Sequence, residues 1–316
     1  MLAPGPVRTA TRTVVARDGT SLAVHRMGGP DDSAARDRRE GRRRPVIVLA
    51  NGLGGPHAAW KPIVEYFANQ YDFVTWDYRG LYGSGRAPTA TPAAYAIDKH
   101  VDDLLQILDE EGVETACFVG WSMGVQVCLE AWKRVGKSRV ESLILLNGTF
   151  GRPLDTVIPM RGARFFVPSA LEWASKLHRP AGHVLRKFAE QPEAVRLLKR
   201  FGMMGETVDE DGFGELVKAF GKLDVQAFLF NLRALGEHDA SSILPTIDVP
   251  VLVIAGDKDK MTPRDLSQQM VRKIPHAEIL IVRGGTHYTA IEFPELVNLR
   301  IERFLGSARQ PSGKRG

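Results

Sequence analysis

Short runs of apolar residues recur along the chain without the alternation of polar and apolar positions that a half-exposed strand shows. They occur at 46–50, 73–76, 116–119, 143–146, 251–255 and 279–282. Such runs are typical of parallel strands in a sheet that helices cover on both faces. Between the second and third runs, apolar residues follow the spacing of one buried helix face. These are Ile97, Val101, Leu104, Leu105 and Leu108. Alternating strands and helices predict an α/β fold with right-handed crossovers.

Two further strands precede these runs. Residues 13–16 and 22–26 have strand-like patterns on either side of the turn Asp18-Gly19. Residues 28–45 are rich in Gly, Asp, Arg and Ser, which predicts a long loop before the first buried strand.

The alternation of strands and helices stops between about residues 151 and 240. This stretch of roughly 90 residues is helical in pattern, with Pro168, Pro180 and Pro192 where helices are expected to start. An insertion of this kind predicts a cap over a site, and a separate helical domain with no role in the site is the alternative. We therefore divide the chain into core (1–150), cap (151–240), core (241–306) and flexible tail (307–316).

The net charge of +5 comes largely from arginines between 36 and 44 and from the C-terminal tail. No aromatic residues lie among them, so we interpret them as solvated segments and expect no nucleic-acid partner. The composition, 44% hydrophobic and 25% charged, is typical of a soluble globular protein. Neither an apolar signal region nor an 18-residue apolar run occurs, so we expect a cytoplasmic protein without stable membrane insertion. Cys117 and Cys128 lie in apolar runs, which predicts two buried thiols and no disulfide or metal site.

The segment Gly120-Trp121-Ser122-Met123-Gly124 matches the pattern G-x-S-x-G. A buried strand precedes it and an apolar helix pattern follows it, which is the context that this pattern requires. Such a turn would hold Ser122 at the N-terminus of a helix, where partial positive charge favours a developing anion. Ser122 is therefore the candidate nucleophile, and a serine in an ordinary strand-to-helix turn is the alternative.

With this motif in its context, the chain resembles the α/β-hydrolase superfamily from about residue 12 to 305. The similarity is greatest to the lid-bearing branch that includes esterases, enol-lactonases, C–C bond hydrolases, haloperoxidases and epoxide hydrolases. The resemblance implies a mostly parallel eight-stranded sheet flanked by helices, with an inserted helical cap. It also implies the chain order serine, then acid, then histidine for a catalytic triad.

A serine hydroxyl needs a neighbouring base to act as a nucleophile at neutral pH. Given the triad order, only His276 and His287 lie far enough along the chain. His276 comes just before a strand, at the wrong end of the sheet, whereas His287 follows the strand at 279–282. His287 lies where α/β sites form, in a loop that resembles the family's late G-x-H segment, so it is the candidate base.

The acid is expected in the loop after the strand at 251–255. This loop, Gly256-Asp257-Lys258-Asp259-Lys260-Met261-Thr262-Pro263, resembles the family pattern G-x-x-D-x-x-x-P. The resemblance places the acid at Asp259, and Asp257 remains the alternative. A carboxylate bonded to the imidazole would set its tautomer and stabilise the imidazolium.

An acyl-transfer reaction also needs two N–H donors for the tetrahedral oxyanion. One is expected to be the backbone N–H of Met123, directly after the candidate nucleophile. The other is assigned to the backbone N–H of Leu53, in the loop after the first buried strand. The family more often has histidine where this chain has Asn51, a departure that affects how the loop is braced.

The segment Asp77-Tyr78-Arg79-Gly80-Leu81-Tyr82-Gly83-Ser84-Gly85 resembles the family's D-x-R-G-x-G-x-S segment with one residue inserted. We interpret it as a charged pair that braces a tight turn. Other side chains are candidates to line a pocket: Trp121, Tyr82, His57 and Trp60. Large apolar side chains in the cap are candidates for a lid, with packing inside the cap as the alternative: Phe165, Phe166, Trp173, Met203, Met204, Phe228 and Phe230.

A serine nucleophile argues against dehalogenases, epoxide hydrolases and dienelactone-type hydrolases, which use aspartate or cysteine at this position in the family. We therefore expect a carboxylesterase or lactonase that acts on a small-molecule ester or lactone through an acyl-enzyme. No metal or organic cofactor is expected. The alternatives are a small-molecule receptor that retains the triad, an acyltransferase and a cofactor-free haloperoxidase.

Overall fold

The computed structural model describes residues 7–29, 44–151, 170–171, 174–175, 178–205 and 207–308, and every structural statement below concerns these residues. Much of the arginine-rich loop, the end of the C-terminal tail, and Phe165, Phe166, Pro168 and Trp173 lie outside them.

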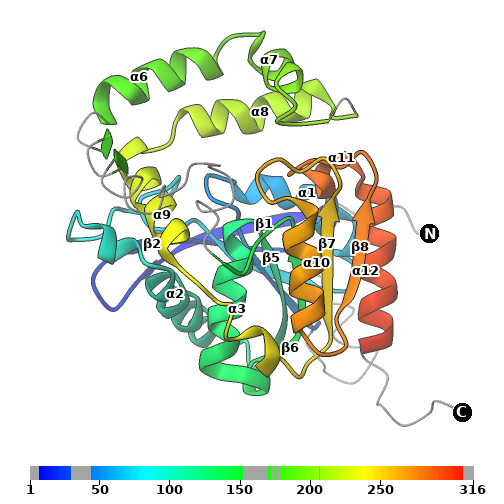
Figure 1. Cartoon of the computed structure of the whole chain (residues 1–316). Coiled ribbons are helices and arrows are strands. Elements are labelled where there is room, and N and C mark those ends of the chain that lie inside the picture. The colour runs from blue at the N-terminus through cyan, green and yellow to red at the C-terminus, as the bar shows by residue number, and fades with distance from the viewer. Residues whose placement is uncertain are drawn as a thin grey trace, which may run out of the picture.

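Eight strands form one sheet in the order β1-β2-β4-β3-β5-β6-β7-β8 (Figure 1). Their bounds are β1 Arg8–Val15, β2 Ser21–Gly28, β3 Val46–Ala50, β4 Asp72–Trp76, β5 Ala116–Trp121, β6 Val140–Leu146, β7 Val251–Gly256 and β8 Glu278–Val282. Strand β2 pairs antiparallel with β1 and β4, and all other pairs are parallel. The predicted fold class is therefore confirmed.

Strand β3 lies between β4 and β5, so the strand order reverses at its carboxyl end. In α/β sheets this reversal opens a crevice where ligands bind. The first strand is longer than predicted, since β1 extends over Arg8–Val15. Most of its residues are exposed. Its pairing with β2 uses backbone groups, which a search for buried apolar residues does not detect.

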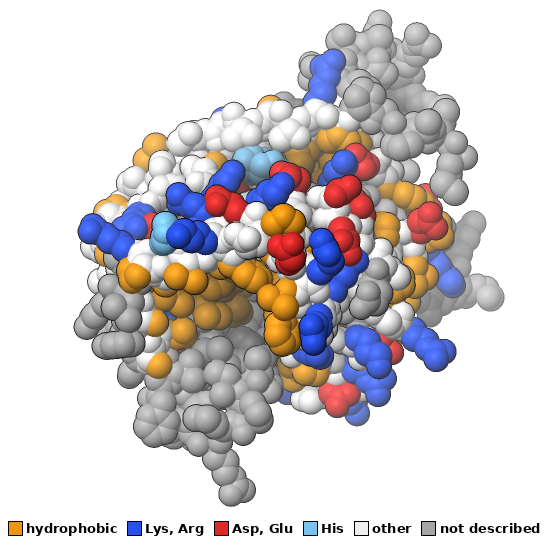
Figure 2. Space-filling view, turned by 90° about the horizontal axis from the view of Figure 1, so that it is seen from above, with side chains coloured by type: hydrophobic (Ala, Val, Ile, Leu, Met, Phe, Trp, Pro, Cys, Tyr) orange, Lys and Arg blue, Asp and Glu red, His pale blue; other side chains and the backbone are white. Residues whose placement is uncertain are grey.

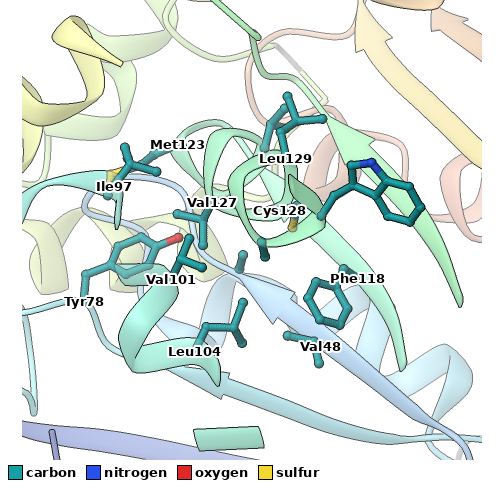
Figure 3. Packing of buried hydrophobic residues seen from close by; sticks show 14 of the residues in the cluster. Val48, Tyr78, Ile97, Val101, Leu104, Phe118, Met123, Val127, Cys128 and Leu129 are labelled. Atoms are coloured by element: carbon teal, nitrogen blue, oxygen red, sulfur yellow. The ribbon is translucent and has the colours of Figure 1, made fainter. Parts of the chain in front are cut away.

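The buried strand residues divide by alternation into two apolar clusters, one on each face of the sheet. Val48 and Phe118 pack with α2 (Ile97–Glu110) and α3 (Met123–Val135), as Figure 3 shows. Ile47 and Val119 pack with α1 (Lys61–Phe67) and α12 (Pro294–Ala308). Helix α10 (Arg264–Lys273) also contributes to the first cluster. Helices on both faces explain why these strands are apolar throughout.

Cys117 and Cys128 are both buried, as predicted, and they belong to the two different clusters.

The residues that the structure describes between β6 and β7 include the α-helices α6 His178–Ala189, α7 Ala194–Arg200, α8 Glu210–Gly221 and α9 Val225–Glu237. Figure 1 shows α6, α7 and α8 above one edge of the sheet. Asp209 and Asp224 cap α8 and α9, each accepting from a backbone N–H of the first turn. Pro180 lies in the first turn of α6, and Pro192 precedes α7.

These helices divide by what they pack against. Helices α6 to α8 share a small apolar cluster of their own that includes Met204 and Phe213. In α9, by contrast, Phe230 belongs to the main cluster and its ring lies 5.4 Å from that of Tyr95. Phe228 also packs against the main cluster. The division of the chain at 151–240 stays a prediction, and α9 packs with the core.

The two ends of the inserted segment meet above α3. The N–H of Ala240 donates to the carbonyl of Phe150 at 2.7 Å, and the side chain of Gln126 donates to the carbonyl of Gly151 at 2.9 Å. No described helix has both the length and the apolar character needed to cross a membrane.

Candidate active site

Ser122 occupies the turn between β5 and α3, with a φ of 55° and a ψ of −114°. Such angles are unfavourable for a residue with a side chain and persist only where neighbouring structure holds them. Here the N–H of Ser122 donates to the carbonyl of Leu146 at 3.0 Å, and its carbonyl accepts from Val125 at 3.1 Å. Ser122 is partly exposed. The turn therefore places a strained serine at the carboxyl edge of the sheet and at a helix N-terminus.

The first turn of α3 packs directly against the end of β3. A Cβ added to Gly124 would lie 2.0 Å from the carbonyl oxygen of Ala50, so only glycine fits there. This contact brings Met123 close to the loop 51–55, which contains Leu53. The two residues predicted to donate backbone N–H groups to an oxyanion thus belong to neighbouring segments.

Asp259 and His287 lie side by side after β7 and β8. The Nδ1 atom of His287 is 2.9 Å from Oδ2 of Asp259, and both side chains are buried. The other carboxylate oxygen, Oδ1, accepts from the N–H groups of Met261 and Thr262, and the Thr262 hydroxyl donates to Oδ2 at 2.6 Å. This geometry suits a carboxylate that orients an imidazole.

The electrostatics of Asp259 favour its ionised form. Burial alone would raise its pKa, but the facing His287 and hydrogen bonds from His287 and Thr262 outweigh burial and hold the pKa below its usual value. Asp257, the alternative acid, is turned elsewhere and accepts from the N–H of Gly284 at 2.7 Å. The structure brings Asp259, and not Asp257, to the ring of His287.

The histidine loop is linked to the candidate nucleophile through Trp121. The indole N–H of Trp121 donates to the carbonyl of His287 at 3.0 Å, and the two ring centroids are 5.8 Å apart. Since Trp121 directly precedes Ser122, the loop that contains His287 packs against the turn that contains Ser122. His276, the other candidate base, is exposed in the turn before β8.

Asn147 is a site residue that sequence reasoning missed. It follows β6, is buried, and has a positive φ of 43°. Its side-chain amide donates to Oδ2 of Asp259 at 3.0 Å and to the carbonyl of Thr286 at 3.0 Å. It therefore joins the acid loop to the histidine loop. Its position at the carboxyl end of a buried strand was the one available signal.

Glu292 is a second missed residue, in α11 (Thr289–Glu292). Its buried carboxylate accepts from the N–H of Thr286 at 2.7 Å and also from the Thr286 hydroxyl. It accepts in addition from the N–H of Gly205, at 2.7 Å, in the inserted helical segment. One carboxylate thus connects the histidine loop to the segment predicted to form the cap.

Aromatic side chains surround the histidine loop. The Tyr288 ring lies 5.6 Å from that of Trp121 and 4.8 Å from that of Phe213 in α8. Burial, with Asp259 and Glu292 nearby, raises the pKa of Tyr288 to about 12, so its hydroxyl stays protonated at neutral pH. Tyr288 was not predicted, although it adjoins His287 in sequence.

A small cavity of about 20 Å³ lies beside these rings. Its lining residues are Ala59, Trp60, Trp121, Leu146, Tyr288, Ala290 and Ile291, and its walls are largely apolar. A space of this size holds about one water-sized group. Of the side chains proposed as pocket lining, Trp121 and Trp60 contribute to this cavity, whereas Tyr82 and His57 do not.

The loop 51–55 is held by hydrogen bonds to side chains whose contacts with it were not predicted from the sequence. The Asn51 side chain donates to the carbonyl of Trp76 at 2.7 Å and accepts from the Trp60 indole at 2.6 Å. The hydroxyl of Tyr78 donates to the carbonyl of Asn51, and that of Tyr82 donates to the carbonyl of Gly54. Asparagine at position 51 thus holds the loop through an amide that both donates and accepts hydrogen bonds.

The same loop also lies under the inserted helices. Gly54 has a φ of +74°, and a Cβ there would lie 2.6 Å from the ring of Phe220 in α8. The backbone of this loop and the ring of α8 therefore touch directly, and a larger residue at position 54 would separate them.

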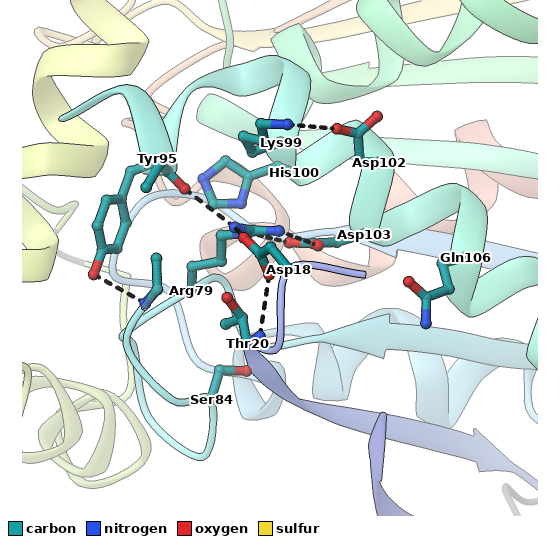
Figure 4. A network of polar contacts seen from close by, with 12 residues as sticks. Asp18, Thr20, Arg79, Ser84, Tyr95, Lys99, His100, Asp102, Asp103 and Gln106 are labelled. Atoms are coloured by element: carbon teal, nitrogen blue, oxygen red, sulfur yellow. Dashed lines mark hydrogen bonds and ion pairs between the residues drawn. The ribbon is translucent and has the colours of Figure 1, made fainter. Parts of the chain in front are cut away.

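A charged pair within the segment 77–85 was predicted, but the structure pairs Arg79 with residues outside this segment. Arg79 makes two 2.7 Å hydrogen bonds to Asp103 in α2 and also binds Asp18, as Figure 4 shows. The turn itself is held by Asp77, which accepts from Gly83 at 3.0 Å, and by the Ser84 hydroxyl. The guanidinium of Arg79 thus pairs with Asp103 and Asp18 rather than with Asp77.

The face seen from the side of the inserted helices carries mixed charge. Figure 2 shows Lys and Arg side chains interspersed with Asp and Glu side chains, with hydrophobic side chains gathered beside them. Among the described residues of this face, neither positive nor negative charge predominates.

The sequence profile for the alpha/beta hydrolase fold matches residues 45–294. Among curated proteins, the chain is 28% identical over 266 residues to one from Agrobacterium fabrum named "Putative carbamate hydrolase RutD", covering 84% of this chain and 95% of that protein. A protein of the same name from Caulobacter vibrioides is 26% identical over 275 residues, covering 84% and 91%.

Solved structures share the fold over nearly the whole chain. A bromoperoxidase from Bacillus anthracis aligns with a TM-score of 0.73 at 17% identity, covering 95% of this chain and all of that one. An enol-lactonase from Burkholderia xenovorans aligns with a TM-score of 0.71 at 22% identity, covering 93% and 100%. An esterase from Exiguobacterium antarcticum aligns with a TM-score of 0.70 at 19% identity, covering 95% and 100%.

Proposed function

Because this chain belongs to the alpha/beta hydrolase fold family and is a hydrolase of that fold, we propose that it is a serine hydrolase acting on a carboxylic ester or lactone. Ser122 is the proposed nucleophile, His287 the base and Asp259 the acid that orients it. The observation that carries this proposal is the strained Ser122 turn packed, through Trp121, against the loop of the His287–Asp259 pair.

The proposed reaction has two halves. His287 takes the proton of Ser122 as the serine oxygen attacks the substrate carbonyl, and the resulting oxyanion accepts from the N–H groups of Leu53 and Met123. The tetrahedral intermediate collapses to an acyl-enzyme, and His287 gives its proton to the departing alcohol. Water then attacks the acyl group while His287 takes its proton. His287 returns that proton to the oxygen of Ser122 as the acid leaves, which restores the free enzyme.

The side chains around the histidine loop support an apolar acyl or alkyl group in the substrate. Trp121 and Tyr288 present aromatic surface beside His287, and the adjoining cavity is largely apolar. An apolar group gains free energy on leaving water for such surroundings. The predicted cap, through Phe213 and Phe220, adds to this surface.

A carbamate is the second candidate substrate. The relatives reported above carry carbamate hydrolase in their names and match over more than nine-tenths of their length. A carbamate presents a carbonyl to the same serine, so the same residues would act on it. The two candidates differ in the group attached to the carbonyl.

The test has two arms. Wild-type protein and Ser122→Ala are first treated with a fluorophosphonate probe, which should label only the wild type. Both proteins are then assayed with p-nitrophenyl esters of increasing chain length, with lactones and with carbamates. Ester or lactone turnover that Ser122→Ala loses by at least a thousandfold is expected, in line with the loss of a triad member.

Ser138→Ala is the matched control, since Ser138 is a serine outside the site that bonds to the carbonyl of Val135. It should label and turn over like the wild type. Equal labelling and turnover in Ser122→Ala would overturn the serine mechanism. Turnover of carbamates alone would keep the mechanism and replace the proposed substrate class.

A further inference from the structure

Three side chains that can bind metal ions meet outside the candidate active site. They are His25 in β2, His57 at the start of the short 3-10 helix η2 (His57–Trp60), and Asp77 directly after β4. One ligand atom from each lies within 4.8 Å of the other two. His25 and Asp77 are buried and His57 is partly buried.

Two buried atoms of this group, Nε2 of His25 and Oδ1 of Asp77, have no hydrogen-bond partner. Nδ1 of His25 lies 2.9 Å from the Thr11 hydroxyl, which leaves Nε2 directed toward Asp77. Nε2 lies 3.2 Å from Oδ2 of Asp77 but is not aligned for a hydrogen bond, and Oδ1 of Asp77 also has no partner. Buried polar atoms are nearly always paired, so these two require an explanation.

We propose that Nε2 of His25, a ring nitrogen of His57 and a carboxylate oxygen of Asp77 bind one divalent transition-metal ion, with zinc as the best fit. Two imidazoles and one carboxylate are a common zinc ligand set, which leaves a fourth position for a water molecule. In metal sites the second ring nitrogen of a ligating histidine usually donates to an oxygen. Here the Thr11 hydroxyl would accept from Nδ1 of His25.

Binding changes the orientation of His57. Its ring is stacked on that of His25, with centroids 3.9 Å apart and an angle of 27° between the planes. A metal ion lies in the plane of each imidazole that binds it, so stacked rings cannot share one ion. Tetrahedral bonds place ligand atoms about 3.3 Å apart. The His57 ring, which is partly exposed, therefore turns while His25 and Asp77 stay in place.

The ion would tie His57 to the paired strands β2 and β4, whose His25 and Asp77 already lie 3.2 Å apart as an ion pair. Asp77 holds the turn at Gly83, and His57 lies two residues after the end of the loop that contains Leu53. A bound ion would therefore stabilise the fold and the position of that loop. None of Ser122, Asp259 and His287 takes part, so this inference does not depend on the proposed hydrolase mechanism.

The test measures metal binding by the full-length protein after removal of metals with a chelator. Zinc is titrated calorimetrically, and cobalt(II) is titrated by its visible absorption, which reports a tetrahedral nitrogen–oxygen site. One equivalent of each ion should bind, and zinc should raise the melting temperature. His57→Ala should weaken binding at least tenfold, and His57→Cys should restore it because a thiolate also binds zinc.

Matched variants locate the ion. His183→Ala removes an exposed histidine of α6, and His287→Ala removes the histidine of the candidate active site; both should bind zinc like the wild type. Thr11→Val should weaken binding by about 10- to 100-fold, as expected for an outer contact of a ligating histidine. Absence of saturable binding, or equal affinity in His57→Ala, would overturn the proposal.

Discussion

Asn147 illustrates how one buried side chain can hold two loops in register. Its amide donates to Asp259 and to the carbonyl of Thr286, which precedes His287. A backbone φ of 43° directs it there, and asparagine adopts such angles more readily than most residues.

Asn147→Ala should lower kcat more than tenfold and reduce the free energy of unfolding by about 1–3 kcal/mol, because two buried acceptors lose a donor. Urea unfolding and ester or carbamate turnover would measure the two effects. Asn298→Ala is the control, since Asn298 is also buried and donates to the carbonyl of Pro62. It should lose stability and keep kcat. Equal kcat in Asn147→Ala would contradict the positioning role.

His100 links stability to pH. Burial, together with the nearby positive charge of Arg79, lowers its pKa from 6.5 to about 3. Between these values the unfolded chain binds a proton that the folded chain does not. The free energy of unfolding should therefore fall as pH decreases from 6.5 toward 3, by about 1.4 kcal/mol per pH unit from this group.

His100→Gln should remove this component, so that its urea midpoint changes less between pH 6.5 and pH 4 than that of the wild type. Above pH 6.5 the group contributes no slope in either protein. His183→Gln, at an exposed position, should keep the wild-type slope. An unchanged slope in His100→Gln would show that another group controls acid sensitivity.

At the scale of elements, α11 and the inserted helices hold the histidine loop from two sides. Glu292 accepts from Thr286 and from the N–H of Gly205. Tyr288 and Ile291 pack against the small cluster of α6 to α8. The inserted segment is therefore coupled to the loop of His287 by a buried carboxylate as well as by apolar contacts.

Glu292→Gln should reduce the free energy of unfolding by about 1.5–3 kcal/mol. The variant replaces one carboxylate oxygen by an NH₂ group, which cannot accept from the N–H of Gly205 or Thr286. Hydrogen exchange at the amides of Gly205 and Thr286 should become faster in the same variant. Glu295→Gln, on an exposed position of α12, should leave both measurements unchanged. Unaltered exchange at Gly205 would argue against the coupling.

At the scale of the whole molecule, Arg79 joins parts of the chain that are distant in sequence. It binds Asp103 in α2 and Asp18 in the turn between β1 and β2, and its side chain is almost wholly buried. Asp103 is buried as well. The antiparallel edge of the sheet and its first long helix thus share one buried cation.

Asp103→Asn should reduce the free energy of unfolding by about 3–5 kcal/mol, since it leaves the buried guanidinium with a weaker partner. Thermal and urea unfolding would measure the loss. Asp109→Asn, which affects an exposed carboxylate bonded to Arg139, should cost less than about 1 kcal/mol. A loss of that small size in Asp103→Asn would mean that Asp18 alone suffices to pair Arg79.

Much of the fold could be predicted because its signals are local. The apolar runs that form β3 to β8, the face of α2 and the glycines around Ser122 each depend on residues close in sequence. The extent of β1 could not be predicted, because most of its residues are exposed and it is held by backbone pairing with β2. The partners of Arg79 could not be predicted either, because Asp103 and Asp18 come close to it only in the folded protein.

By itself, the sequence determined the class of fold, the strand-to-helix turn at Ser122 and two loops able to supply an acid and a base, because backbone periodicity and glycine positions act over a few residues. Only the tertiary structure decided that Asp259 rather than Asp257 faces His287, that Asn147 and Glu292 hold the histidine loop, and that His25, His57 and Asp77 meet. Those contacts arise where strands distant in the chain become neighbours in the sheet, and no local pattern encodes that proximity.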